Sequence, residues 1–242
     1  MRVAALIPAL NAANTLEPVV RGALGQIETV VLIDDGSADG TADVAARAGA
    51  TVLKHEVNRG KGAALKTGFK WACQHGFDGV VTLDADGQHL PREIPKFIDC
   101  HATTGGDLII GSRAHLFGQM LPRRRMANRF SAWSIAFASG TNITDSQSGY
   151  RYYSTRLLRG LKLRSNGFAM ESEVIVRAGR GGFKVLTTPI DLGFVDGLST
   201  SHYKPLKDTV RIFAVVFVTL FECLLKSESR RQKAERKQKA ES

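Results

Sequence analysis

The chain has 242 residues, of which 43% are hydrophobic and 23% are charged, and its net charge is +10. This length favours one large α/β domain, and the apolar fraction excludes a mostly disordered chain. The three cysteines lie far apart without a Cys-x-x-Cys pair, so neither a disulfide scaffold nor a thiolate zinc site is expected. The positive charge favours an anionic partner, which leaves nucleic acid, a membrane surface and phosphorylated substrates open.

Short β-branched runs alternate with helical patterns through the first half of the chain. Strands are predicted over Val3–Ile7, Thr29–Ile33, Thr51–Leu53, Gly79–Leu83 and Asp107–Ile110. Helices are predicted to start at Asn14 or Thr15, at Thr41, at Lys61 and at Pro91. Because the strands are apolar almost throughout, we expect a parallel sheet that is covered by helices on both faces. Ligands bind such sheets at the carboxyl ends of the strands.

The pattern is looser beyond residue 112. The predicted order is a helix near Asn128–Ala138, a turn-rich stretch over Ser139–Ser154, a helix over Glu171–Gly179, a strand over Phe183–Ile190 and a polar loop over Asp191–Lys204. Trp71 and Trp133 are expected in the core. No linker divides the chain, so residues 1–211 are predicted to form one domain.

The segment Ile212–Leu225 is apolar except for Thr219 and Glu222. As a helix its 14 residues reach about 21 Å, which is less than the roughly 30 Å core of a bilayer. It either docks on the sheet or lies in the membrane interface. Residues 226–242 contain seven Lys or Arg and three Glu, and this positive charge favours binding to an anionic membrane leaflet. Residues 212–242 are therefore predicted to attach the protein peripherally to the cytoplasmic face of a membrane.

The strongest motif is Asp84-Ala85-Asp86-Gly87-Gln88, directly after a predicted strand. Carboxylates at i and i+2 of extended backbone point the same way, so both can address one divalent cation and the phosphates that it bridges. Oxygen ligands favour Mg²⁺ or Mn²⁺ over Zn²⁺. An ordinary acidic turn is the alternative interpretation.

Two further motifs follow neighbouring strands. Asp34-Asp35-Gly36-Ser37 could bind a ribose hydroxyl or a base edge, or form an ordinary turn. Asn58-Arg59-Gly60-Lys61-Gly62 places two cations at a helix start, which suits phosphate oxygens. The spacing fits neither a Walker A loop nor a dinucleotide-binding fingerprint.

Seven segments carry a resemblance to a known family. They are IPALNAANTL, VLIDDGSADGTADVA, NRGKGAALKTGF, TLDADGQH, IIGSR, DSQSGYRYYS and FAMESEVIVRAGRGGFKV. Together they resemble the family 2 glycosyltransferases of GT-A fold, most closely the dolichyl-phosphate mannosyltransferase group and its bacterial polyprenyl-phosphate relatives. The resemblance spans about residues 3–211. It implies a GT-A domain with a mainly parallel sheet, a Mg²⁺ or Mn²⁺ cofactor and a GDP- or UDP-sugar donor.

The resemblance also implies roles for individual residues. The cation and the nucleotide diphosphate would lie on Asp84, Ala85, Asp86 and Gln88, with Lys61 at the phosphates. The nucleoside would contact Asp35, in a base pocket formed by Pro8, Leu10 and Ile33. Arg113 would face the phosphates and, with Asp86, act in catalysis. One departure is Ala12, where the family usually has an acid.

The implied reaction is an inverting sugar transfer to a polyprenyl (dolichyl or undecaprenyl) phosphate. A lipid phosphate is already an anion, so it needs no general base. The phosphate would be positioned by a basic set made of Arg123, Arg124, Arg125, Arg129 and Lys204, whose alternative interpretation is a solvated patch.

Two other functions remain open at this point. Transfer to a saccharide or lipid hydroxyl would need a base, for which Glu171 and Glu173 are candidates. A basic nucleic-acid-binding or membrane-adaptor protein is the alternative outside enzymes. No nucleic-acid-binding motif is present in the sequence, so no nucleic-acid partner is expected.

Overall fold

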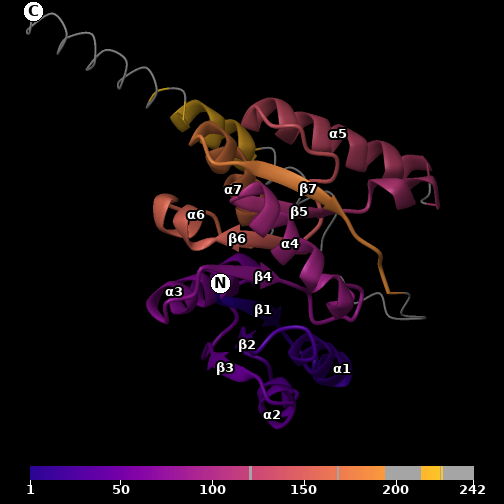
Figure 1. Ribbon diagram of the computed structural model, residues 1–242, viewed down its shortest axis with the longest axis vertical. Helices are drawn as coiled ribbons and strands as arrows, with labels where there is room; N and C mark the ends of the chain where they lie inside the picture. The colour runs from indigo at the N-terminus through magenta and orange to yellow at the C-terminus, as the bar shows by residue number, and fades with distance from the viewer. Residues whose placement is uncertain (120–121, 168, 194–213, 224, 226–242) are drawn as a thin grey trace, which may run out of the picture.

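The computed structural model describes residues 1–119, 122–167, 169–193, 214–223 and 225, apart from the side chains at 119, 122–124 and 127. It forms a seven-stranded sheet flanked by helices (Figure 1). Lys204 and residues 226–242 lie outside this description, as do the side chains of Arg123 and Arg124.

The sheet has the strand order β3-β2-β1-β4-β6-β5-β7. The strands are β1 (Val3–Ala9), β2 (Thr29–Asp34), β3 (Thr51–Lys54), β4 (Gly79–Thr82), β5 (Leu108–Ser112), β6 (Arg151–Ser154) and β7 (Val185–Pro189). All neighbouring pairs are parallel except that β6 runs antiparallel to both β4 and β5. The expected mainly parallel α/β sheet is confirmed.

Strand β6 differs from the sequence prediction, which placed turns up to Ser154. Its four residues are fully or almost fully buried between two strands. A run this short has no readable alternation, and the turn-forming residues before it hide its start. Its aromatic pair, Tyr152 and Tyr153, is the feature typical of a strand.

The helices are α1 (Ala13–Leu24), α2 (Thr41–Arg47), α3 (Lys61–Gln74), α4 (Ile94–Thr104), α5 (Pro122–Ser139), α6 (Thr155–Gly160) and α7 (Ala169–Arg180). Two 3₁₀ turns, η1 (Pro91–Glu93) and η2 (Ala114–Gln119), precede α4 and α5. Helix α5 starts six residues before its predicted start at Asn128, so the run of arginines from residue 123 is helical. Helix α6 was not predicted.

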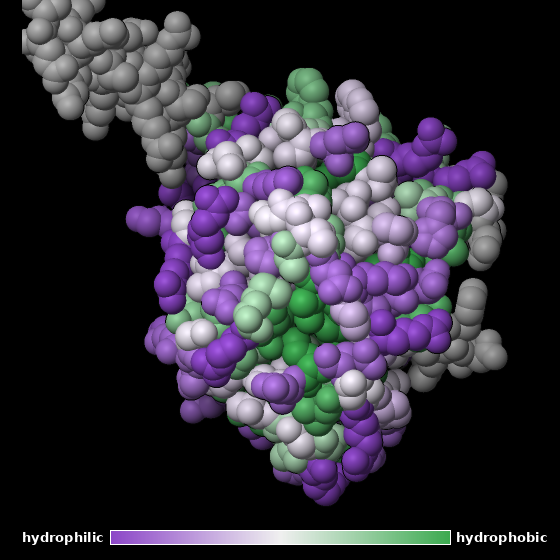
Figure 2. Space-filling view, in the orientation of Figure 1, coloured by the Kyte–Doolittle hydropathy of each residue, from purple (hydrophilic) through white to green (hydrophobic). Residues whose placement is uncertain are grey.

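Alternation along β1 creates two cores, one on each face of the sheet. Ala4 and Leu6 pack with α3, α6 and α7, whereas Ala5 and Ile7 pack with α1, α2 and α4. Both faces of the sheet are therefore buried, as the apolar strands predicted. Figure 2 shows that the molecular face in view is mainly hydrophilic, with a narrow central strip of hydrophobic residues.

Residues 214–223 are helical and pack against α7. Val216 and Thr219 are buried, and Glu222 accepts hydrogen bonds from Arg164 and from Arg177 Nη2, the latter at 3.0 Å. The inner side of this helix thus docks on the domain, whereas Phe217 on its outer side is exposed. Within the described residues, no helix has the length and hydrophobicity needed to cross a membrane.

The expectation for Trp133 is wrong. Its side chain lies on the outside of α5 with 64% of its surface exposed. Trp71 is partly buried and packs against the core as expected. Because apolar residues occur on both sides of α5, their spacing alone did not reveal which side faces inwards.

Candidate active site

The predicted donor-side residues gather at one edge of the sheet. Strands β1, β2 and β3 are parallel and end in register, with Ala9 beside Asp34 and Asp34 beside Lys54. Leu10 and Asp35 directly follow two of these strands, and Lys61 starts the helix after the third. The acidic motif follows β4 and Arg113 follows β5, so the topology delivers all of these side chains to the carboxyl edge.

Lys61 links two carboxylates at the centre of this edge. Its Nζ lies 2.7 Å from Asp84 Oδ1 and 3.5 Å from Glu171 Oε1. Burial alone would lower the pKa of Lys61, but attraction to Asp84 and Glu171 outweighs it and raises the pKa. Burial opposes ionisation of Asp84, yet Lys61, with smaller contributions from His89 and Arg113, lowers its pKa to about 2. Lys61 and Asp84 are therefore both charged at neutral pH.

Gly149 leaves the space in which these charges meet. A Cβ atom at this position would lie 2.7 Å from Lys61 Nζ, 3.1 Å from Glu171 Oε1 and 3.3 Å from Asp84 Oδ2. Gly149 lies within the segment DSQSGYRYYS, and no role was predicted for it. Its function is visible only when β6 places the loop before it beside α3 and α7.

The remaining members of the acidic motif differ in their surroundings. Asp86 is half-buried, and its Oδ1 accepts the backbone N–H of Gln88 at 3.0 Å. Ala85 is buried, and Gln88 is exposed. His89 Nδ1 accepts the backbone N–H of Asp84 at 2.9 Å, and burial lowers the pKa of this histidine. His89 thus fixes the motif's backbone.

The donor set of the motif fits a hard divalent cation. Its side chains offer only oxygen ligands on the carboxylates and amide, which is the chemistry that Mg²⁺ and Mn²⁺ prefer. Among the described residues, no three His, Cys, Asp or Glu side chains form a cluster that could enclose an ion. Magnesium sites that use one or two carboxylates are completed by substrate phosphates and water.

Asp35 is already occupied by hydrogen bonds. Oδ1 accepts from the Arg59 N–H at 3.0 Å and from His55 Nδ1 at 2.7 Å, and Oδ2 accepts from the Gly60 N–H at 2.7 Å. Asp35 and His55 therefore hold the loop that leads to Lys61. His55 was missed because a single histidine in a sequence carries no spacing signal. Pro8 and Ile33 are buried in their strands, and Leu10 is half-buried.

Arg113 is paired with a carboxylate for which no role was predicted. Its Nε lies 2.7 Å from Asp145 Oδ2, and its Nη2 lies 3.2 Å from Asp145 Oδ1. Burial would raise the pKa of Asp145, but Arg113 lowers it. The fully buried Arg151 donates to the carbonyls of Ser146, Ser148 and Glu171 at 2.7–2.9 Å. This guanidinium holds the loop of Asp145 and Gly149 against α7.

The expected acceptor residues are only partly described. Arg125 and Arg129 lie one turn apart on α5, and both are exposed. The side chains of Arg123 and Arg124 and the whole of Lys204 fall outside the described residues. The interpretation of this set as an anion-binding surface stays a prediction.

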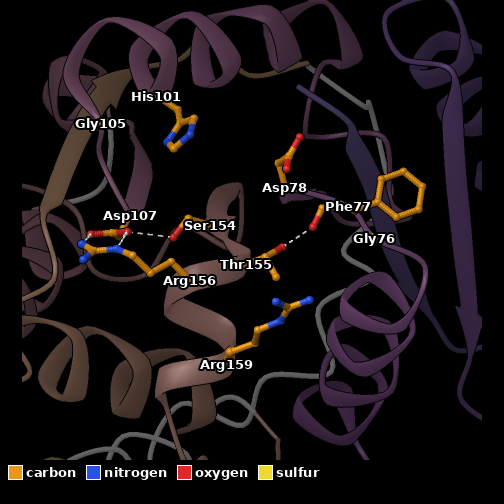
Figure 3. Close-up of a pocket in the computed structure, with 10 residues that line it drawn as sticks. All are labelled: Gly76, Phe77, Asp78, His101, Gly105, Asp107, Ser154, Thr155, Arg156 and Arg159. Atoms are coloured by element: carbon orange, nitrogen blue, oxygen red, sulfur yellow. Dashed lines mark hydrogen bonds and ion pairs between the residues drawn. The ribbon is translucent and has the colours of Figure 1, made fainter.

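A separate hollow of about 740 Å³ lies at the opposite edge of the sheet (Figure 3). Asp78 and Asp107 line it, at the starts of β4 and β5, together with Ser154 at the end of β6. Arg156 of α6 donates a hydrogen bond from Nε to Asp107 at 3.0 Å. These two charged groups of the hollow therefore connect the start of β5 to α6. It contains none of the predicted site residues.

Comparisons with known proteins agree with this arrangement. Residues 4–164 match the family model described as glycosyl transferase family 2. The chain is 33% identical over 204 residues to undecaprenyl-phosphate mannosyltransferase from Micrococcus luteus, covering 78% of this chain and 83% of that one. It is 34% identical over 209 residues to polyprenol monophosphomannose synthase from Mycolicibacterium smegmatis, covering 78% and 76%.

The fold is also shared with a solved enzyme. Glucosyl-3-phosphoglycerate synthase from Mycobacterium tuberculosis, in complex with Mn²⁺, uridine diphosphate and phosphoglyceric acid, superimposes with a TM-score of 0.65 at 20% identity. The match covers 92% of this chain and 78% of that one. The protein therefore shares the α/β fold of this enzyme. It belongs to glycosyltransferase family 2 and is a glycosyltransferase.

Proposed function

We propose that this enzyme moves one sugar from a nucleotide-sugar donor to a polyprenyl phosphate, with inversion at the anomeric carbon and with Mg²⁺ or Mn²⁺ as cofactor. The observation that carries the proposal is the charged cluster at the carboxyl edge, where Lys61 joins Asp84 and Glu171 beside the half-buried Asp86. The relatives named for undecaprenyl and polyprenol phosphate support the acceptor class.

The donor would lie along the carboxyl ends of β1, β2 and β4. The nucleoside is assigned to Asp35 and to the pocket of Pro8, Leu10 and Ile33, and the diphosphate to Lys61 and Asp84–Asp86. A cation held by Asp84, Asp86 and Gln88 would offset the charge that develops on the leaving diphosphate. Because Asp84 also pairs with Lys61, the lysine holds this carboxylate in its ionised form.

The acceptor assignment follows from the state of the two candidate bases. Glu171 faces Lys61 at 3.5 Å, and Glu173 accepts hydrogen bonds from the Ser165 N–H at 2.8 Å and from Arg177 Nε at 2.6 Å. Glu173 is thus held by these hydrogen bonds, whereas Glu171 is held by its ion pair with Lys61. A phosphate oxygen needs no base, so a lipid phosphate is the better fit. Its oxygen forms a bond to the anomeric carbon as the bond to the diphosphate oxygen breaks.

The cations outside the donor site would receive the lipid phosphate. Arg125 and Arg129 are exposed on α5, and Arg123, Arg124 and Lys204 complete the proposed set. Arg113 would support the leaving phosphates, with Asp145 fixing its guanidinium plane.

The acceptor's chain must stay in the bilayer, because each CH₂ contributes about 0.8 kcal/mol to membrane partitioning. We therefore assign the enzyme to the cytoplasmic face, held by the helix around residues 214–223 and by the basic tail. The three free cysteines accord with a reducing compartment.

The proposal is tested by incubating the purified protein with a panel of radiolabelled GDP- and UDP-sugars, polyprenyl phosphate and Mg²⁺ or Mn²⁺. Label is expected in the organic phase with at least one donor, and chelation should abolish it. Transfer from the same panel to saccharide or lipid hydroxyls, with no lipid-phosphate product, would favour the alternative acceptor class.

A further inference from the structure

The outer side of α5 carries a row of large apolar side chains that are more than half exposed. Its side chains Met126, Phe130, Trp133 and Phe137 are 70%, 55%, 64% and 71% exposed. Their spacing of four, three and four residues places them within about 60° of the helix circumference. A surface helix normally presents polar residues outwards, so this row is unusual. We call these four residues the aromatic row.

The aromatic row is separate from the side by which α5 packs. Ala132, Ile135 and Ala138 are buried, and Ile135 and Ala138 belong to the same core cluster as Val174 of α7. The rings in the row contact one another, with centroids 6.0 Å apart for Phe130 and Trp133 and 6.2 Å apart for Trp133 and Phe137. The inward residues thus lie on the side of the helix opposite the row.

A second helix also exposes large apolar side chains. The helix at residues 214–223 also packs against α7, and its outward residues Phe217 and Phe221 are 72% and 57% exposed. Figure 1 shows this helix and α5 at the same end of the molecule, away from α2 and β3. The two helices thus expose large apolar groups at one end.

Charge and composition identify the partner. Arg125 and Arg129 are exposed beside the aromatic row, and the chain as a whole carries +10. Helix α5 contains no Asp or Glu, so a two-fold dimer through this row would offer these arginines no carboxylate on the partner's α5. Exposed Trp and Phe flanked by arginines suit the boundary between lipid headgroups and acyl chains.

We infer that the aromatic row inserts into an anionic bilayer surface, so that α5 is a membrane-contact element in addition to the C-terminal segment. The inference rests on the proposed function in one respect, which is that the acceptor is a lipid. It would place Arg125 and Arg129 at the headgroup level, where a lipid phosphate lies.

The test uses the full chain and needs neither donor nor acceptor. Because the chain has two tryptophans, Trp71→Phe leaves Trp133 as its only tryptophan. Adding phosphatidylglycerol vesicles should shift the Trp133 emission to shorter wavelength, and lipids brominated on the acyl chain should quench it. Phosphatidylcholine vesicles should give a much smaller effect.

A second measurement compares two variants in vesicle co-sedimentation. Phe130→Ser/Phe137→Ser should lower the affinity for phosphatidylglycerol vesicles about tenfold or more, because two large apolar groups no longer insert. Val57→Ser is the matched control. Val57 is 66% exposed and follows β3, the outermost strand on the opposite side of the sheet from β7. This variant should bind vesicles as the unsubstituted protein does. Circular dichroism establishes that both variants are folded.

Three results would overturn the inference. The first is Trp133 emission that is already blue-shifted without lipid, in a protein that is dimeric and that Phe130→Ser/Phe137→Ser converts to a monomer. It would mean that the row binds a second copy. The same emission in a monomer would mean that another segment of the chain covers the row. Red-shifted emission that vesicles do not change would mean that the row stays in water. Each result is obtained whether or not the enzyme transfers sugar, so failure of the proposed function is recognised separately.

Discussion

At the scale of single residues, the site depends on charges that are held at fixed positions before any substrate binds. Lys61 and Asp84 lie 2.7 Å apart with shifted pKa values, and Asp35 is fixed by three hydrogen bonds. Asp86 is the least constrained of these acids, because its described hydrogen bond is to the Gln88 N–H. It is therefore the residue whose charge can be removed with the smallest structural effect.

Asp86→Asn should lower activity by two or more orders of magnitude, because the amide keeps the shape of the side chain but lacks the negative charge that binds the cation. The melting temperature should change by no more than about a degree or two, since Asp86 is half-buried. Initial rates at limiting Mg²⁺ in metal-depleted buffer measure the effect. Normal turnover under those conditions would refute the metal assignment.

Gly149→Ala should separate Lys61 from Asp84, because the new methyl group would lie 2.7 Å from Lys61 Nζ. We expect a donor KM at least several-fold higher and a lower kcat. Gly118→Ala is the matched control, since a Cβ there meets no atom within 4 Å. Steady-state kinetics on both variants measure these effects. Unchanged KM and kcat values for Gly149→Ala would show that the close approach of Gly149 to Lys61 is unimportant.

At the scale of secondary-structure elements, the carboxylate of Asp107 holds several elements of the second half of the chain together by hydrogen bonds. Asp107 precedes β5 and accepts hydrogen bonds from Ser154 Oγ at 2.8 Å, Arg156 Nε at 3.0 Å and the Lys184 N–H at 3.0 Å. Burial would raise the pKa of Asp107, but these hydrogen bonds lower it below the ordinary value of 3.8. The groups belong to β6, to α6 and to the residue before β7.

The lowered pKa gives the acid dependence a definite sign. Asp107 stabilises the fold fully above its unfolded-state pKa near 3.8, and this contribution is lost as the pH falls through the lower folded-state value. Asp107→Asn should lower the free energy of unfolding at pH 7 and flatten its decline below about pH 4. Urea unfolding over a pH series measures this. An unchanged slope would mean that other carboxylates cause the acid dependence.

Sequence patterns predicted the strands that are continuous apolar runs. The strands β1, β2 and β4 were found within a residue or two because both faces are apolar. The start of α5 was missed because Arg123–Arg125 read as a surface stretch, and Trp133 was misplaced because α5 is apolar on two sides. The family resemblance implied the roles of the donor-side residues, and the place of Asp35 and of the acidic motif at the carboxyl edge was predictable because both follow apolar strands. Asp145 and Gly149 were not, since their roles arise from the antiparallel placement of β6.

At the scale of the whole molecule, the fold separates the proposed donor site from the residues proposed to contact the membrane. The donor residues lie at the carboxyl edge of the strands, whereas the exposed apolar residues lie on α5 and at 214–223. Because Val216 and Thr219 are buried against the domain, deleting all of 212–242 would also expose core surface. A shorter deletion after Leu225 removes the tail's net charge of +4 and retains the docked helix.

Deleting residues 226–242 should lower the affinity for anionic vesicles and make the remaining binding less sensitive to salt, because the apolar contacts are unscreened. Donor binding, followed by calorimetry with the nucleoside diphosphate, should be nearly unchanged. High salt should weaken the binding of the full chain without abolishing it. Equal partitioning of the two proteins on anionic vesicles at low salt would contradict a role for the tail.

The most direct measurement compares a matched pair of acceptors, undecaprenyl phosphate and undecaprenol, which differ only in the phosphate. With the active nucleotide sugar and Mg²⁺ or Mn²⁺, mass spectrometry should find a glycosyl phosphate lipid of inverted anomeric configuration from the first acceptor and no product from the second. Because undecaprenol lacks the anionic oxygen that reacts without a general base, the alcohol should remain unreacted. Equal transfer to undecaprenol would contradict the account.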